Sequence, residues 1–383
     1  MDPYAQLGIR PVINAAATLT RLGGSRIPRT VAEAMAAAAG TFVDLSELQE
    51  RVGDRIATLT RNEAAYVSSG ASAGIVHAVA ACIAGVDPAI IDAFPSLHGV
   101  VRREVIIARS QRNGYDYAAR QTGATLVEIG PSTADLDAAL GERSACVLWF
   151  AGSHYAEGAL PLTDVVAAAH ERGVPVVVDA AAQIPPIASL WRFTRELGAD
   201  LAIFSGGKGL RGPQSSGLVL GRRDLVAGCR ANGNPNATIG RPMKVGKEEL
   251  VGILAAVEWS LAQDEPGLIA RYEATVRLWV EGLADIPGVT VERRYPSEAG
   301  QPHGRAIVRI GPDYRATRDE VVAALWDGAR RIAVGTSAVE SDTIALNPQT
   351  LEPGEDAVVL AVLRRVLTGQ AEPSHSSEER ASA

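Results

Sequence analysis

A lysine among glycines is the residue whose position points most clearly to chemistry. An apolar strand is predicted over Leu201–Phe204, and it runs into a small-residue turn, Ser205-Gly206-Gly207, that presents Lys208. Glycine costs conformational entropy and offers no side chain for packing, so this setting is poorly explained by stability. A nucleophilic amine that moves between two positions explains it better. We therefore predict that Lys208 is a catalytic residue.

An aspartate ends an earlier predicted strand. The strand covers Val174–Val178, and Asp179 is followed by Ala180, Ala181 and Ala182. A pyridoxal 5'-phosphate (PLP) site needs a lysine for a Schiff base and an acid to pair with the protonated pyridine nitrogen. A small residue, here Ala181, leaves room for the flat ring. The pattern predicts PLP as the cofactor and Lys208 and Asp179 as the catalytic pair.

A turn rich in serine and glycine supplies a candidate phosphate site. A short strand is predicted to end near Val67, and Ser69, Gly70, Ala71 and Ser72 then open a helix. Free backbone N–H groups and the helix dipole favour an anion at such a point. Serine and glycine also cap ordinary helices, so the turn alone is weak evidence. Together with Lys208 and Asp179, it predicts that these four residues bind the cofactor phosphate.

The composition bounds the class of protein. The chain has 383 residues, 47% of them hydrophobic, and a net charge of −7. This fits a globular enzyme with two domains and disfavours nucleic acid as the main partner. We expect no membrane span and no secretion signal. Three widely spaced cysteines indicate a reducing cytoplasm, with neither a disulfide framework nor a metal site.

Strands and helices alternate through the first two thirds of the chain. Continuous apolar strands between amphipathic helices predict a mostly parallel sheet covered on both faces. We expect an α/β large domain with a seven-stranded sheet and a small C-terminal α+β domain. The predicted boundaries are an N-terminal arm at 1–29, the PLP-binding domain at 30–250, the small domain with linking helices at 251–368 and a disordered tail at 369–383.

Polar and aromatic residues follow two more predicted strands. Gln111 and Tyr115 come after the strand at 104–108, and either residue could cover the free face of the cofactor ring. The alternative for a tyrosine here is that it anchors the next helix. His154 and Tyr155 follow the strand that ends at Phe150, so they could also reach the crevice.

Four segments together resemble fold-type-I PLP enzymes and, within them, the family of selenocysteine synthase and D-glucosaminate-6-phosphate ammonia-lyase. The resemblance covers most of the chain and implies a fold like that of aspartate aminotransferase. The C-terminal Ile344–Pro348 and Leu351–Glu355 are closer to the ammonia-lyase branch. The segments that carry the resemblance are residues 13–25, 68–73, 178–182 and 205–214.

The resemblance implies roles for individual residues. Lys208 is the Schiff-base lysine and Asp179 the partner of the pyridine nitrogen. Ser205 joins the turn at 69–72 in holding the phosphate, and Ala181 packs under the ring. Gln183 departs from the acidic or apolar residue expected in the lyase branch. It is similar to a glutamine that donates to the cofactor's phenolic oxygen in related enzymes.

The expected activity is that of a PLP-dependent lyase acting on a small amino acid or amino-sugar acid. Elimination across the α and β carbons would yield a 2-oxo acid and ammonia. Racemisation or epimerisation, transamination and a non-catalytic protein of the same fold remain alternatives. Selenium transfer to tRNA fits less well, because the chain is acidic and no extra domain is expected before Asn14. A plain nucleotide-binding protein is disfavoured because no G-x-G-x-x-G follows the first strand.

An anionic substrate also requires a cation, most naturally an arginine. Lys244, Arg305 and Arg309 are further cations that could serve. Fold-type-I sites resemble one another in lying at a subunit interface, so we expect a homodimer or higher homo-oligomer in which Arg241 could serve the neighbouring site. The candidate substrate-binding residues are Asn14, Thr18, Thr20, Arg21, Tyr115, Arg211 and Arg241.

Overall fold

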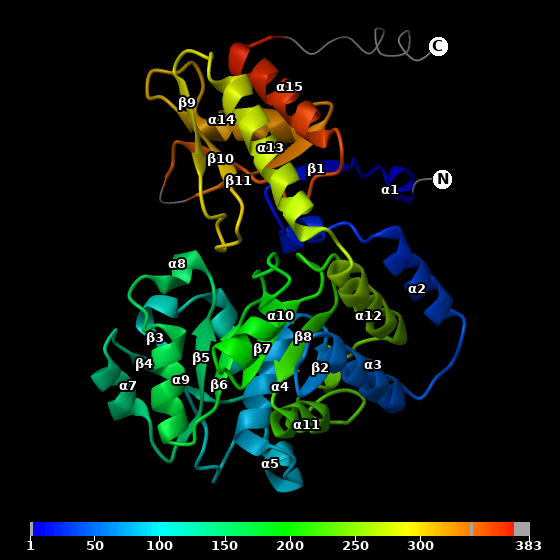
Figure 1. Ribbon diagram of the computed structural model, residues 1–383, viewed down its shortest axis with the longest axis vertical. Helices are drawn as coiled ribbons and strands as arrows, with labels where there is room; N and C mark the ends of the chain where they lie inside the picture. Colours follow the sequence, from blue (N-terminus) through cyan, green and yellow to red (C-terminus); the bar gives the residue numbers. More distant parts are fainter. Residues whose placement is uncertain (1–2, 338–339, 371–383) are drawn as a thin grey trace. The chain divides into compact units, whose positions relative to one another are not determined.

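The computed structural model describes residues 3–337 and 340–370 and divides into two compact units (Figure 1). The larger unit consists of Gly23–Glu265 and Glu298–Gln301. The smaller unit consists of Met1–Leu22, Pro266–Ser297 and Pro302–Ala383. A short piece of the C-terminal third therefore belongs to the larger unit.

The larger unit is built on a seven-stranded sheet with the order β2-β8-β7-β6-β5-β3-β4. Strand β8 runs antiparallel to both of its neighbours, and all other pairs are parallel. This confirms the predicted α/β fold with a mostly parallel sheet. The strands are β2 (Ala64–Ser68), β3 (Glu104–Ala108), β4 (Thr125–Ile129), β5 (Ser144–Phe150), β6 (Val176–Asp179), β7 (Leu201–Ser205) and β8 (Gly217–Gly221).

Both faces of this sheet are buried. Alternate residues of β6 point to opposite sides, so Val177 joins one hydrophobic cluster while Val176 and Val178 join the other. Apolar residues of α3, α9 and α12 pack in the cluster of Val176, and those of α4 and α11 pack in that of Val177. The unit's helices are α2 (Arg29–Ala39), α3 (Leu45–Leu59), α4 (Ala71–Ala84), α5 (Pro88–Ala93), α6 (Tyr117–Arg120), α7 (Thr133–Ala139), α8 (Ser153–Ala156), α9 (Leu162–Glu171), α10 (Ser189–Trp191), α11 (Arg223–Ala231) and α12 (Lys247–Leu261).

Short helical turns complete the larger unit. They are η2 (Arg109–Gln111), η3 (Gly114–Asp116) and η5 (Arg241–Met243), which are 3₁₀ turns, and η4 (Arg192–Glu196), which is a π-helical turn. Because β5, β6 and β7 are parallel neighbours, their carboxyl ends meet at one edge of the sheet. Open α/β sheets bind ligands at this edge.

The smaller unit has a five-stranded sheet of order β1-β11-β12-β10-β9, in which β1 and β11 are parallel and the other pairs antiparallel. The predicted arm thus contributes β1, which is held by pairing with β11. The strands are β1 (Val12–Ala15), β9 (Val289–Arg294), β10 (Arg305–Ile310), β11 (Arg331–Thr336) and β12 (Thr343–Leu346), and the helices are α1 (Pro3–Gln6), η1 (Thr20–Leu22), α13 (Glu265–Leu283), α14 (Arg318–Asp327) and α15 (Glu355–Thr368).

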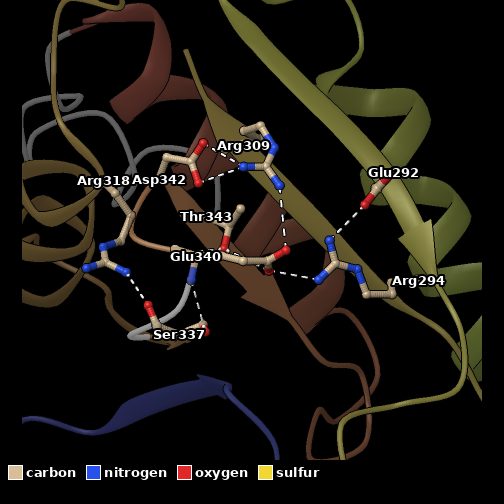
Figure 2. Close-up of polar contacts among 8 residues, drawn as sticks. All are labelled: Glu292, Arg294, Arg309, Arg318, Ser337, Glu340, Asp342 and Thr343. Carbon is tan, nitrogen blue, oxygen red and sulfur yellow. Dashed lines mark hydrogen bonds and ion pairs between the residues drawn. The ribbon is translucent and has the colours of Figure 1, made fainter. Parts of the chain in front are cut away.

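An ion-pair network ties the segment before β12 to β9 and β10 (Figure 2). Glu340 lies 2.8 Å from Arg294 and 3.7 Å from Arg309. Arg309 also pairs with Asp342 at 2.6 Å. These side chains are partly exposed, so solvent screens the pairs, and their main effect is to position the segment.

The units divide the chain at points other than the predicted 29/30 and 250/251. Helix α12 belongs to the larger unit because Leu250, Ile253 and Val257 pack in its core. The predicted tail begins at Gly369, which caps α15, and its residues 371–383 lie outside the described part. Among residues 3–337 and 340–370, no helix is long and apolar enough to cross a membrane.

Candidate active site

The sheet brings Lys208 and Asp179 to the same edge. Asp179 is the last residue of β6 and pairs in register with Ile203 of β7. Backbone hydrogen bonds then shape the turn after β7. The N–H of Gly206 donates to the Ser216 carbonyl at 2.9 Å, and the N–H of Arg211 donates to the Lys208 carbonyl at 2.9 Å. The predicted catalytic pair thus lies on adjacent strand ends.

The glycines beside Lys208 allow close approach of other backbone segments. A Cβ on Gly207 would lie 2.7 Å from the Gln214 Cα, and one on Gly209 would lie 2.7 Å from the Ile184 carbonyl carbon. Neither position has room for a side chain. The glycines therefore let the turn fold back tightly while it presents the lysine.

Burial acts on both members of the pair. Asp179 is 8% exposed, and its Oδ1 accepts a hydrogen bond from the Ala181 N–H at 2.9 Å. Burial raises the Asp179 pKa, against the opposing effects of the Ala181 N–H and of Lys208. Burial lowers the Lys208 pKa, and the charge of Asp179 opposes that shift. A buried carboxylate is suited to a ring-nitrogen cation, and a lysine of lowered pKa to proton transfer.

Helix α4 begins beside the lysine turn with free backbone donors. Its N-cap, Gly70, has φ +141°, and no side chain caps the helix. A Cβ on Gly217 would lie 2.6 Å from the Gly70 carbonyl carbon and 2.9 Å from the Ala71 nitrogen. Gly217 pairs with Ser205 at the end of β7. The α4 N-terminus therefore lies next to the strand that carries the lysine.

Three serine hydroxyls accompany these donors. Within the described part of the chain, the side chains of Ser69, Ser72 and Ser205 form no hydrogen bond. Other helices differ from α4 in this respect, because their N-termini are capped by side chains, namely those of Asp44, Asp87, Ser132 and Thr317. An uncapped helix N-terminus with unbonded hydroxyls nearby is suited to a phosphate. Together with the buried Asp179 and the half-buried Lys208, these groups fit PLP. In residues 3–337 and 340–370, no group of three or more His, Cys, Asp or Glu could hold a metal ion.

A segment distant in sequence packs against the loop after β6. The Gln183 Nε2 donates to the Ala299 carbonyl at 2.7 Å and to the Ala151 carbonyl at 3.3 Å. The Gln301 Nε2 donates to the Ala182 carbonyl at 2.8 Å. The Gln183 donor is thus engaged by backbone carbonyls, and its contact with a cofactor stays a prediction, as does that of the partly buried Ala181.

The residues near the end of β5 have distinct positions. Gln111 is buried and exchanges hydrogen bonds of 2.9 and 3.1 Å with the backbone of Phe150, so it braces this strand end. Tyr115 is 57% exposed. Burial, followed by the charges of Asp179 and Tyr115, raises the pKa of Tyr155. The Tyr155 ring centroid lies 3.9 Å from that of His154.

The sequence also predicted that Tyr155 could reach the crevice, and this stays a prediction. Its only sequence signal was its place after a strand end, which it shares with several other residues. The segment at 298–301 had no signal, because nothing local predicts a contact across more than one hundred positions.

The candidate cations have different surroundings. The Arg211 Nε donates to the Arg26 carbonyl at 2.9 Å, and its guanidinium lies 5.5 Å from the Trp259 ring centroid. Arg241 and Lys244 line a cavity of about 610 Å³ in the larger unit. Arg309 is ion-paired in the network of Figure 2. Asn14, Thr18, Thr20, Arg21 and Arg305 belong to the smaller unit, and their roles stay predictions.

Comparisons with known proteins show which family the chain is similar to. A family model described as Aminotransferase class-V matches residues 108–232. The D-glucosaminate-6-phosphate ammonia lyase of Salmonella typhimurium is 32% identical, over 95% of this chain and 97% of its own length. The 5'-C-glycyluridine monooxygenase-decarboxylase of a Streptomyces species is also 32% identical, over 98% of this chain and 95% of its own length.

A solved structure gives the same result in three dimensions. The structure of D-glucosaminate-6-phosphate ammonia-lyase has a TM-score of 0.83 and 31% identity, and the match covers 97% of this chain and 100% of that one. Both the sequence and the fold are thus shared over nearly the whole length. The chain belongs to the fold-type-I PLP-dependent enzymes, in the family of D-glucosaminate-6-phosphate ammonia-lyase and selenocysteine synthase.

Proposed function

We propose that this enzyme is an ammonia-lyase that converts an amino-sugar acid or a small hydroxy amino acid into a 2-oxo acid and ammonia. The observation that carries the proposal is the placement of the buried Asp179 at the end of β6 and the half-buried Lys208 in the turn after the adjacent strand β7, beside the uncapped α4 N-terminus. The length and identity of the match to the Salmonella lyase support the choice of reaction.

The residues of the chain have distinct roles in this proposal. When bound, PLP supplies an electron sink for the carbanion formed at the substrate's α-carbon. The α4 N-terminus with Ser72 and Ser205 holds the phosphate, and Asp179 pairs with the ring-nitrogen cation. Lys208 takes the proton from the α-carbon. Because burial lowers its pKa, more of its amine is neutral near pH 7 than in an exposed lysine.

The balance of the reaction fixes what must be measured. Loss of the α-proton and the β-hydroxyl releases one water and leaves an enamine. The enamine tautomerises to an imine, and hydrolysis of this imine consumes one water. The net products are a 2-oxo acid and ammonia, with no change in oxidation state. The Streptomyces relative favours a second candidate, oxidative decarboxylation, which would consume O₂ and release CO₂.

The test is to supply the purified, PLP-loaded enzyme with D-glucosaminate 6-phosphate, its unphosphorylated form and serine. Ammonia, 2-oxo acid, CO₂ and O₂ uptake are then measured. We expect equal amounts of ammonia and 2-oxo acid without O₂ uptake, and no turnover by Lys208→Ala. Release of CO₂ with O₂ uptake would show that the activity is oxidative decarboxylation and that the proposed lyase reaction is wrong. If the enzyme binds PLP but turns over none of these compounds, the assignment of the fold stands and the proposed lyase activity is wrong.

We further propose that the enzyme is a cytoplasmic homodimer in which Arg241 serves the neighbouring site. Phe42 is 99% and Val43 51% exposed, and Val43 lines the cavity that also contains Arg241. Aromatic residues and arginine are enriched at protein interfaces. Light scattering should give twice the chain mass, and Phe42→Asp should lower it to one chain. A monomeric wild type with full activity would contradict this proposal.

A further inference from the structure

A second cavity lies at the other end of β7 from Lys208. It has a volume of about 460 Å³, and its walls form where β2 and β7 begin and β8 ends. Strands rise about 3.3 Å per residue, so the length of β7 separates this cavity from the lysine turn. The volume lies within the range of roughly 300–1,000 Å³ that is usual for small-molecule sites.

The acidic groups in this cavity already have partners. Asp200 binds the Arg222 guanidinium at 2.6 Å through Oδ1. Its Oδ2 accepts from the Val176 N–H at 2.7 Å and lies 2.8 Å from the His170 Nε2. The Glu63 carboxylate accepts from the backbone N–H of Arg223 at 3.2 Å. Both carboxylates are therefore hydrogen-bonded to groups other than the two remaining arginines of the cavity.

Two arginines in the cavity have no carboxylate partner within residues 3–337 and 340–370. The Arg61 guanidinium lies 4.4 Å from the Trp191 ring centroid. The Arg195 Nη1 donates to the Arg61 carbonyl at 3.1 Å. In the same part of the chain, the backbone N–H of Gly198, which also lines the cavity, has no acceptor. The cavity thus combines positive charge with free hydrogen-bond donors.

Irregular backbone presents both arginines. Arg61 has φ +57°, in the left-handed region where glycine is favoured after a helix end. Arg195 lies in the π-helical turn η4, a feature that is frequent at functional sites. A cation at position 61 also interacts favourably with the C-terminal dipole of α3. That effect does not account for Arg195 at the same cavity.

We propose that this cavity binds the phosphate group of a small phosphorylated metabolite through Arg61 and Arg195. Guanidinium groups pair with phosphate through two parallel hydrogen bonds, and the Gly198 N–H is available for a third contact. The cavity volume leaves room for an organic group on the phosphate, so a phosphate monoester should bind more tightly than inorganic phosphate.

The test is calorimetric titration of the PLP-loaded enzyme with inorganic phosphate and with ribose 5-phosphate at constant ionic strength. We expect one site per chain that depends on the arginines, with tighter binding of the ester. Arg61→Gln and Arg195→Gln should each weaken it about tenfold or more, as expected for loss of a charged hydrogen bond. Arg192→Gln is the matched control, because Arg192 is an exposed arginine of η4 outside the cavity lining.

The outcomes separate this site from the active site. A phosphate held near Lys208 would bind equally well to wild type and to both cavity variants, and that result would overturn the proposal. Equal weakening by Arg192→Gln would show a general charge effect and would also overturn it, as would the absence of binding at 10 mM probe. Tighter or equal binding of inorganic phosphate would identify a free-anion site instead of an ester site. Arg61→Gly is a control for misfolding. Glycine suits φ +57°, so this variant should keep the fold but no longer bind the probe.

Discussion

Replacing Asp179 by asparagine should stabilise the cofactor-free protein while it impairs catalysis. Asparagine keeps an oxygen that can accept from the Ala181 N–H and removes the buried charge. Because burial raises the Asp179 pKa, the folded state holds the proton more tightly than the unfolded state does. The folded state therefore loses stability as pH rises above the ordinary aspartate pKa. At neutral pH the ionised Asp179 carboxylate destabilises the folded apoprotein relative to the unfolded chain.

The expected gain is about 1 kcal/mol, which is common for a single stabilising substitution. In a chain of this size it corresponds to a rise of roughly 2 °C in Tm. Loss of the partner of the ring nitrogen should lower kcat by about 10²–10³-fold, the effect of removing one preorganised electrostatic group. The assays are urea unfolding of cofactor-stripped protein and turnover with saturating PLP.

Asp200→Asn is the matched control. Asp200 is also buried, but it is bonded to Arg222, His170 and the Val176 N–H. Its replacement should destabilise the protein by about 1–3 kcal/mol, because bonds to a charged group are lost. The kcat of the folded variant should be unchanged. If Asp179→Asn destabilises the apoprotein as much as Asp200→Asn does, the carboxylate is structural and the reasoning fails.

Four further predictions concern single substitutions, the last with a control variant. Lys208→Met should raise the stability of the apoprotein at pH 7, because burial lowers the lysine pKa in the folded state. The gain in stability should fade toward pH 10, where the wild-type lysine loses its charge in both states. A gain that does not change with pH would contradict this. Burial lowers the pKa of His77 from 6.5 to about 4, so wild type should lose about 3 kcal/mol of stability between pH 6.5 and pH 4 that His77→Gln does not lose, as measured by urea unfolding across that range. Gly70→Ala should cost about 1–3 kcal/mol and weaken PLP binding, because φ +141° suits only glycine; an alanine variant with wild-type Tm and cofactor affinity would exclude this. Ser72→Ala should weaken PLP binding about tenfold at unchanged Tm, whereas Ser132→Ala, which removes the α7 cap, should cost about 1 kcal/mol of stability and leave cofactor affinity unchanged.

The sequence by itself determined the class of fold and the residues that are predicted to carry the chemistry. Lys208 and Asp179 each follow an apolar strand, and parallel strands bring their carboxyl ends to one edge, so the convergence of these residues followed from local pattern. The same holds for the α4 N-terminus, where small residues precede a helix. Each of these features is encoded within a few neighbouring residues.

Only the tertiary structure decided the contacts between distant segments. It placed residues 298–301 against Gln183, engaged Gln111 with the end of β5, and paired β1 with β11. It also assembled the cavity of Arg61 and Arg195 from separate helix ends. Such contacts depend on which surfaces meet when the core packs, and no local propensity encodes that choice.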